Sequence, residues 1–190
     1  MKIVLGSESP RRRALLEGMG VPFEAVSIHA DESFPTGLRG GDIPLFISRE
    51  KAEAYRGQLE DGQLLITADT IVWVDGEQLG KPADAEDAKR MLRLLSGKTH
   101  QVFTGVTLTS KTRQTAFVDT TDVTFREMSE EEIAHYVEVY RPLDKAGAYG
   151  IQEWIGYVAC TALNGSYFNV MGLPTERLWE ELVNEWDYRI

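Results

Sequence analysis

The chain has 190 residues, with 43% hydrophobic and 26% charged residues, and these proportions are ordinary for a folded protein. This length allows one large domain or two small lobes, with enough buried surface for a substantial core. The net charge of −10 argues against broad binding to nucleic acid or to membrane surfaces. The sequence has no signal-peptide pattern and no apolar run of membrane-spanning length, so a cytoplasmic protein is expected.

The first predicted helix begins with a cluster of arginines. Residues 3–5 predict a short strand, and Ser9 and Pro10 then suit the N-cap and the first helical turn. Arg11, Arg12 and Arg13 follow in that turn, where the helix dipole disfavours cations. A bound phosphate would remove this conflict, because backbone N–H groups, serine hydroxyls and guanidinium groups all bind it. A solvated basic turn is the alternative, and anion binding is favoured over it.

A strand, a loop and a second helix are expected next. Residues 23–28 alternate as a strand does, and residues 34–41 form a loop rich in glycine and proline. Asp42 can cap a helix that runs to about Gly57, with an apolar stripe along one face. Lys51 lies on that stripe. Its ammonium either reaches water at the edge of the stripe or points into a cleft, and the spacing does not decide between them.

The most strand-like run in the chain contains one carboxylate. Residues 64–74 are apolar almost throughout, which indicates a strand buried on both faces, and Asp69 lies in the middle. A buried carboxylate is costly unless it has a cation, a set of donors or a place at a cleft. A structural aspartate bonded to loop amides is the alternative. A functional role is favoured, because an aspartate in mid-strand has no turn of its own to cap.

The rest of the chain predicts further strands and helices. Pro82 pushes Lys81 toward an extended conformation, and the small residues of Asp144–Gln152 would let a ligand approach the backbone closely. The other expected elements are a hairpin at Asp75-Gly76, a helix from Asp84 to Gly97, strands at 100–109 and 114–125, a helix begun by the capping box Ser129–Glu132, a strand at 157–163 and a last helix after Pro174. Helices and strands alternate first and strands cluster later. This order predicts an α/β domain with a mixed sheet and allows two lobes with a cleft between them.

Residues with matching chemistry come from separate segments. The cations are Arg11, Arg12, Lys51 and Lys81, and the carboxylates are Glu32 and Asp69. Several cations suit a polyphosphate, and two carboxylates suit a divalent metal ion or a general base for water. Hydrolysis of a nucleoside triphosphate, phosphoryl transfer and simple nucleotide binding all fit this set of residues, and the residues alone do not choose among them.

A series of short motifs runs in order along nearly the whole chain. They are Ser7–Arg12, Arg49–Ala52, Ala68–Val72, Leu79–Pro82, Leu95–His100, Asp144–Gln152 and Gly165–Pro174. Together they resemble the Maf family (septum formation inhibitor-like), whose members act as nucleoside triphosphate pyrophosphatases. The resemblance implies one domain over residues 1–190, similar to the inosine triphosphate pyrophosphatase fold. That fold is an elongated mixed sheet flanked by helices, in two lobes with a central active-site cleft.

The resemblance also implies a role for each candidate residue. It makes Asp69 the catalytic proton acceptor. Phosphate binding falls to Ser7, Arg11, Arg12, Lys51 and Lys81, substrate specificity to Arg11, Thr70 and Gln152, and a divalent metal ion (Mg²⁺ or Mn²⁺) to Glu32 and Asp69. Arg13 has no matched role and is expected to be solvated.

The same resemblance implies substrates and partners. The Gly150-Ile151-Gln152 ending resembles the branch of the family that prefers dTTP and UTP, which are cleaved to the nucleoside monophosphate and pyrophosphate. A cytoplasmic homodimer is expected, without nucleic-acid or membrane partners. The alternative function is a nucleotide-binding regulator of septum formation that does not depend on hydrolysis, and a phosphatase releasing orthophosphate is a third.

Overall fold

A computed structural model describes residues 1–189 and confirms a mixed α/β fold. The strands are β1 (Lys2–Gly6), β2 (Phe23–Val26), β3 (Gln63–Val74), β4 (Glu77–Leu79), β5 (Thr99–Thr109), β6 (Gln114–Phe125) and β7 (Cys160–Asn164). They form one seven-stranded sheet in the order β2-β1-β3-β5-β6-β7, with β4 paired to β3. β1 is parallel to β2 and β3, whereas β4 and β7 are antiparallel to their neighbours, so the sheet is mixed as predicted.

Helices flank this sheet. They are α1 (Pro10–Gly18), α2 (Asp42–Arg56), α3 (Ala85–Leu95), α4 (Glu130–Tyr140), the 3₁₀ turn η1 (Ala146–Ala148), α5 (Trp154–Val158), α6 (Tyr167–Met171) and α7 (Thr175–Trp186). α2 begins at Asp42 itself, and Gly41 is its N-cap without a side-chain hydrogen bond, so the expected capping by Asp42 is wrong. Between residues 1 and 189, no helix combines the length and the apolar character that crossing a membrane requires.

The chain divides into two compact units, and three strands contribute residues to both. The first unit comprises Met1–Asp69, Thr104–Asp119 and the chain from Gly172 onward. The second comprises Thr70–Phe103 and Thr120–Met171. Strands β3, β5 and β6 each pass from one unit to the other. On β3, the boundary between the units falls between Asp69 and Thr70.

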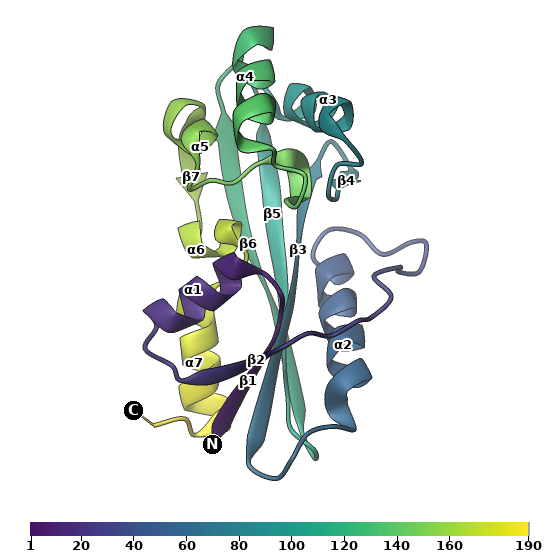
Figure 1. Ribbon diagram of the computed structural model, residues 1–190, viewed down its shortest axis with the longest axis vertical. Helices are drawn as coiled ribbons and strands as arrows, with labels where there is room; N and C mark the ends of the chain where they lie inside the picture. The colour runs from purple at the N-terminus through teal and green to yellow at the C-terminus, as the bar shows by residue number, and fades with distance from the viewer. Residues whose placement is uncertain (190) are drawn as a thin grey trace. The chain divides into compact units, whose positions relative to one another are not determined.

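In the first unit, α1 and α2 cover opposite faces of β1 and β3. Both helices connect parallel strands, and such crossovers are right-handed. The chain moves from β1 to its neighbour β2 through α1, and then from β2 back past β1 to β3 through α2. The reversal of direction places the two helices on opposite faces, and Figure 1 shows α7 on the same face as α1.

Helix α2 lies directly on the sheet at its first turn. A Cβ atom at Gly105 of β5 would lie 2.4 Å from the backbone of Pro44 and Leu45, so only glycine fits there. A cluster of buried hydroxyl groups then fixes the helix. Its contacts are Ser48 Oγ to Thr107 Oγ1 at 2.8 Å and Thr67 Oγ1 donating to the Ser48 carbonyl at 2.7 Å. Because these three side chains are fully buried, α2 is held in one register against β3 and β5.

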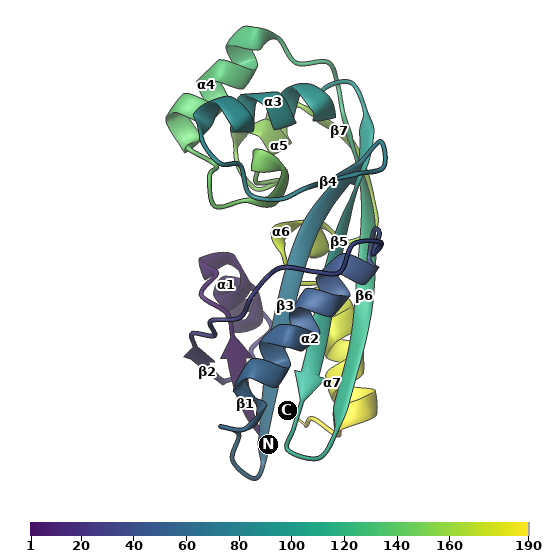
Figure 2. The ribbon, with the colours of Figure 1, turned by 90° about the vertical axis from the view of Figure 1, so that its right-hand side faces the viewer.

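In the second unit, Figure 2 shows α3, α4 and α5 gathered on one face of its strands. The capping box at the start of α4 is confirmed, since Ser129 and Glu132 exchange both hydrogen bonds. The strand expected at 157–163 is wrong in its first part, because Trp154–Val158 is helix α5. A Cβ atom at Gly156 would lie 1.7 Å from the Ile151 carbonyl oxygen. The close return of the chain at this glycine overrides the strand preference of the residues that follow it.

The core of the second unit contains a neutral histidine. His100 is buried, its Nε2 lies 2.7 Å from the Tyr149 hydroxyl, and its Nδ1 has no partner among the described residues. Burial lowers the pKa of His100 to about 4, because a charged imidazole would be desolvated there. The folded state therefore binds fewer protons than the unfolded state between pH 6.5 and pH 4.

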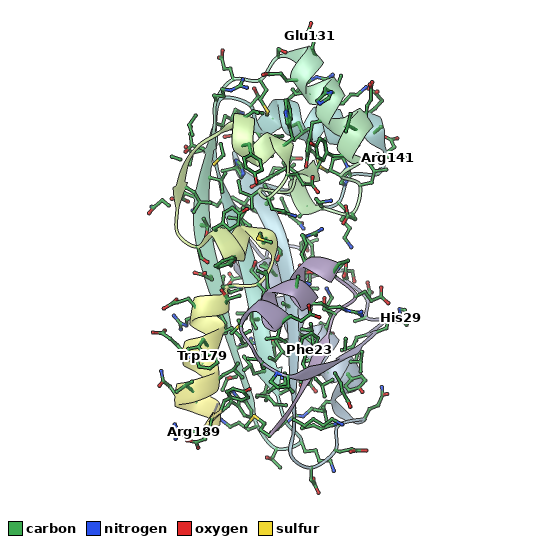
Figure 3. The ribbon with its side chains drawn as sticks, turned by 60° about the vertical axis from the view of Figure 1, so that its left-hand side comes forward. Phe23, His29, Glu131, Arg141, Trp179 and Arg189 are labelled. Carbon is green, nitrogen blue, oxygen red and sulfur yellow. The ribbon has the colours of Figure 1, made fainter. Side chains whose placement is uncertain are left out.

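We expect this histidine to make the protein less stable as the pH falls. His100 should contribute a loss of about 2 kcal/mol in the free energy of unfolding between pH 7 and pH 5. Urea unfolding at several pH values measures it, with His100→Gln showing the smaller loss. The exposed His29 (Figure 3) provides the control for replacing a histidine at the surface, and the pH dependence of His100→Gln is compared with that of His29→Gln. Equal pH dependence in wild type and His100→Gln would contradict the expectation.

Candidate active site

The start of α1 has the geometry that the sequence predicts. Ser9 is the N-cap, its side chain accepts from the Arg12 backbone N–H, and Pro10 is the first helical residue. Ser7 directly follows β1 and is buried, and its Oγ accepts a hydrogen bond from the Ser9 N–H at 3.2 Å. Arg13 is exposed, as expected. The turn therefore combines backbone N–H groups, hydroxyls and guanidinium groups at a helix N-terminus, which is a suitable environment for an anion.

Arg12 is tied to the end of the chain as well as to this turn. Its Nε donates to the Gly172 carbonyl at 2.7 Å, just before α7. Burial lowers the pKa of the Arg12 guanidinium, while the nearby carboxylates of Asp69 and Glu32 oppose the shift. Arg11 also acts on it, as a like charge. Arginine stays charged under these conditions, so Arg12 brings a cation close to both candidate carboxylates.

Lys51 joins those two carboxylates. Its Nζ lies 2.8 Å from Glu32 Oε1 and 2.9 Å from Asp69 Oδ1. The Lys51 and Asp69 side chains are only 12% and 14% exposed, whereas Glu32 is 53% exposed. The position of Lys51 on its helix allowed an ammonium that reaches water or one that points inward. The structure shows the second, because the Lys51 ammonium is largely buried and paired with two carboxylates. Asp69 has the cation that a carboxylate inside a buried strand requires.

The surrounding elements explain why Lys51 meets Asp69. Lys51 follows Ser48 by nearly one helical turn, and Asp69 follows Thr67 by two residues on the same side of β3. The hydrogen bond between Thr67 and Ser48 therefore fixes the helix and the strand at the level where the ammonium and carboxylate meet. β1 pairs in parallel with β3 through Gly6 and Thr67, so Ser7 and Asp69 both lie just beyond this pair, at the carboxyl end of β1.

The carboxylates fit a divalent cation bound together with a substrate. Among residues 1–189, no group of three or more His, Cys, Asp or Glu side chains could hold a metal ion. Glu32 and Asp69 nevertheless direct oxygen atoms at one point, now taken by the Lys51 ammonium. Mg²⁺ is commonly bound by one or two carboxylates together with substrate phosphates and water. The donor set of this chain therefore fits such an ion if phosphate oxygens complete its coordination.

The second unit contains the other candidate residues, Thr70, Lys81 and Gln152. Lys81 is exposed just after β4, and the preceding Gly80 carbonyl accepts from the Gly147 N–H at 3.0 Å. A Cβ atom at Gly147 would lie 2.8 Å from Val72 Cγ2, two residues after Thr70 on β3. The segment that ends in Gln152 thus packs beside the strand that carries Thr70 and beside the end of β4. Gln152 Oε1 is buried without a hydrogen-bond partner among the described residues.

The structure brings some of the candidates together and also reveals residues that sequence reasoning missed. In the first unit, ion pairs connect Lys51 with Glu32 and Asp69. Charge effects connect Arg12 with these carboxylates and with Arg11, and the pairing of β1 with β3 places Ser7 near Asp69. Around Gln152, three missed side chains form one hydrogen-bonded network, namely Tyr136, Lys145 and Glu153. A lysine within a segment of small, apolar residues was the one available signal. Its ionic partners, Asp144 and Glu153, lie close to it in the chain, whereas Tyr136, which bonds Glu153, comes from α4, and the sequence does not place that helix beside this segment.

Comparisons with known proteins agree with the motifs. The profile of the family described as Maf-like protein matches residues 2–185. A Bacteroides thetaiotaomicron protein named dTTP/UTP pyrophosphatase is 55% identical over 95% of this chain and 94% of its own length. A protein of the same name from Porphyromonas gingivalis is 55% identical over 95% of this chain and 92% of its own length.

Solved structures give a more distant match. A nucleoside-triphosphatase / dITP/XTP pyrophosphatase from Mycobacterium abscessus aligns over 66% of this chain and 73% of its own, with a TM-score of 0.40 and 19% identity. The family assignment rests instead on the profile over nearly the whole chain and on the relatives that share more than half of its residues. The chain belongs to the Maf-like protein family.

Proposed function

We propose that the protein is a nucleoside triphosphate pyrophosphatase that hydrolyses dTTP and UTP to the nucleoside monophosphate and pyrophosphate. The observation that carries the proposal is the Lys51 ammonium held between Asp69 and Glu32, with Arg12 close to both carboxylates. The relatives named dTTP/UTP pyrophosphatase, at 55% identity, support the choice of substrates.

The first unit would supply the groups that act on the triphosphate. Ser7, Arg11, Arg12 and the N–H groups at the start of α1 bind phosphate oxygens, and Lys51 neutralises further charge. Asp69 accepts a proton from the water that attacks the α-phosphorus. The bond from this phosphorus to the bridging oxygen breaks, and pyrophosphate leaves with the bonding electrons. The nearby cations stabilise the charge that develops on it.

A divalent cation, Mg²⁺ or Mn²⁺, is part of the proposal. Glu32 and Asp69 would hold it, and when bound to the phosphates it would neutralise charge there. The fit of these two carboxylates to such an ion supports this assignment.

The remaining candidate residues would recognise the rest of the substrate. Lys81 binds phosphate, and Thr70 and Gln152, together with Arg11, set the base preference. The buried Gln152 Oε1 supports this role, because an unpaired buried acceptor is costly and the N3–H of thymine or uracil would satisfy it.

Two further parts of the proposal are a cytoplasmic location, which rests on the sequence pattern, and a homodimer, which rests on the family resemblance. Cell fractionation tests the location, and light scattering of the purified protein tests the dimer. A monomer at micromolar concentration would overturn that part without affecting the proposed reaction.

The reaction is tested by incubating the purified protein with Mg²⁺ or Mn²⁺ and a panel of triphosphates, with every product identified. We expect dTTP and UTP to be the best substrates and to give monophosphate and pyrophosphate in equal amounts. Release of orthophosphate and a nucleoside diphosphate would instead show a phosphatase. If neither dTTP nor UTP is consumed with either metal, the proposed reaction is wrong.

A further inference from the structure

Gln152 lies in a tight turn whose first and last residues are Gly150 and Glu153. The Glu153 N–H donates to the Gly150 carbonyl at 2.9 Å, which places Ile151 and Gln152 at the two central positions. A Cβ atom at Gly150 would lie 3.1 Å from Gln152 Nε2, 3.0 Å from Glu153 Cδ and 3.2 Å from Lys145 Cε. Three polar side chains therefore converge on a residue that has no side chain of its own.

One tyrosine hydroxyl holds both ends of this turn. Tyr136 is fully buried and lies on α4, the helix that Figure 3 shows with Glu131 labelled at one end and Arg141 at the other. Its hydroxyl accepts from the Gly150 N–H at 3.0 Å and donates to Glu153 Oε2. Burial and this bond to Glu153 raise the pKa of Tyr136, so the hydroxyl keeps its proton and remains a donor.

A buried lysine completes the network. The Lys145 side chain is 11% exposed, and its Nζ lies 2.8 Å from Asp144 Oδ1 and 3.1 Å from Glu153 Oε1. Two carboxylates around one ammonium compensate the cost of burying it. Lys145 binds Glu153 Oε1 and Tyr136 binds Glu153 Oε2, so both carboxylate oxygens of Glu153 are held. Between Lys145 and Gly150 the chain takes left-handed backbone angles at Gly147 (φ 67°) and at Ala148 (φ 58°). Alanine adopts this conformation only where its surroundings enforce it.

We propose that Tyr136, Lys145 and Glu153 are positioning residues that hold the Gln152 amide in one orientation and so set the preference for uracil-type bases. The inference rests on the proposed function and extends it. A uracil-type edge offers an N3–H donor flanked by carbonyl oxygens, whereas cytosine offers an N3 acceptor beside an amino group. An amide that can rotate presents either its oxygen or its nitrogen at the same place and therefore accepts both bases. A fixed amide with its oxygen presented discriminates against cytosine.

Removal of the Tyr136 hydroxyl tests this proposal. For Tyr136→Phe we expect the KM for UTP to rise about tenfold while kcat changes by less than about twofold, since the turn loosens but the reacting groups do not. The preference for UTP over CTP, as a ratio of kcat/KM values, should fall about tenfold. Tyr140→Phe is the matched control, because Tyr140 is one turn further along α4 and half-exposed, and it should keep the wild-type ratio.

A second pair of variants keeps the proposal testable if Tyr136→Phe does not fold. Lys145→Met should lower the same ratio, and Lys145→Arg, which retains a cation for Glu153, should restore most of it. A role in stability alone would lower the melting temperature and reduce activity toward all substrates equally. An unchanged UTP-to-CTP ratio in Tyr136→Phe or Lys145→Met would therefore overturn the inference.

The inference and the proposed function can fail separately. Calorimetric titration with UMP and CMP gives the same base preference without hydrolysis. If the wild type binds UMP more tightly than CMP but hydrolyses no triphosphate, the proposed reaction fails. The positioning role is then tested by comparing the UMP and CMP affinities of the variants with those of the wild type. If the wild type prefers neither UTP over CTP in hydrolysis nor UMP over CMP in binding, the positioning role is overturned.

Discussion

Replacing Asp69 by asparagine is expected to lower kcat for dTTP and UTP about a thousandfold, with little change in the melting temperature. The side chain keeps its shape, and its amide oxygen can still accept from Lys51 Nζ, which lies 2.9 Å from Asp69 Oδ1. What the variant loses is the proton acceptor for the attacking water, and general-base catalysis typically contributes a factor of about 10²–10⁴. Steady-state kinetics measures the loss, and thermal unfolding checks that the fold is intact.

The matched control is Asp61→Asn. Asp61 belongs to the same unit, is paired with Lys111 and is 93% exposed, so its replacement should leave kcat within about twofold of the wild type. A kcat for Asp69→Asn within about tenfold of the wild type would remove Asp69 from its proposed role. The same variant tests the alternative function, because a cell-division phenotype that survives the loss of hydrolysis would favour a regulator.

Replacing Lys51 by methionine is expected to lower kcat/KM about a hundredfold or more. Methionine keeps much of the length of the side chain but removes the ammonium that lies between Glu32 and Asp69. The variant therefore loses a cation next to the triphosphate, and a charge-stabilising group in such a site is worth about 10²–10³ in rate. Lys111→Met is the control, since the Lys111 ammonium forms an exposed pair in the same unit.

A double variant distinguishes a shared role from two independent ones. If Lys51 and Asp69 act on one reaction step, Lys51→Met should cost much less when Asp69→Asn is already present than it does in the wild type. Losses that simply multiply would show that the two residues act separately. That outcome would contradict a shared role of Lys51 and Asp69 in one reaction step.

Local signals predicted much of the fold. The cap at Ser9, the capping box at Ser129 and the hairpin at Asp75-Gly76 depend on residues a few positions apart, and the structure confirms all three. The long apolar strand around Asp69 is confirmed as well, because burial on both faces of a sheet leaves a direct trace in the sequence. Within that apolar pattern, Asp69 stood out as a buried carboxylate that requires a partner.

Contacts between distant segments could not be predicted in the same way. Lys51 is Asp69's partner because a hydroxyl cluster seats α2 on the sheet, and spacing along one helix contains no information about that seating. Tyr136 and Glu153 meet across separate elements, so neither stood out in the sequence. The strand expected at 157–163 was wrong in its first part for a similar reason, since the close approach of Gly156 to Ile151 depends on the fold in three dimensions.

The buried hydroxyls of Ser48, Thr67 and Thr107 have a consequence for how the protein tolerates mutation. They are fully buried, and the alignment of Lys51 with Asp69 depends on the register that they fix. Exchange of a threonine hydroxyl for a methyl group preserves size and shape, yet it leaves the opposing oxygen without its partner. Variants that look conservative can therefore lose activity while remaining folded. Substitutions on the solvated surface of α2 are expected to leave this register unchanged, because they do not touch the buried hydroxyl cluster.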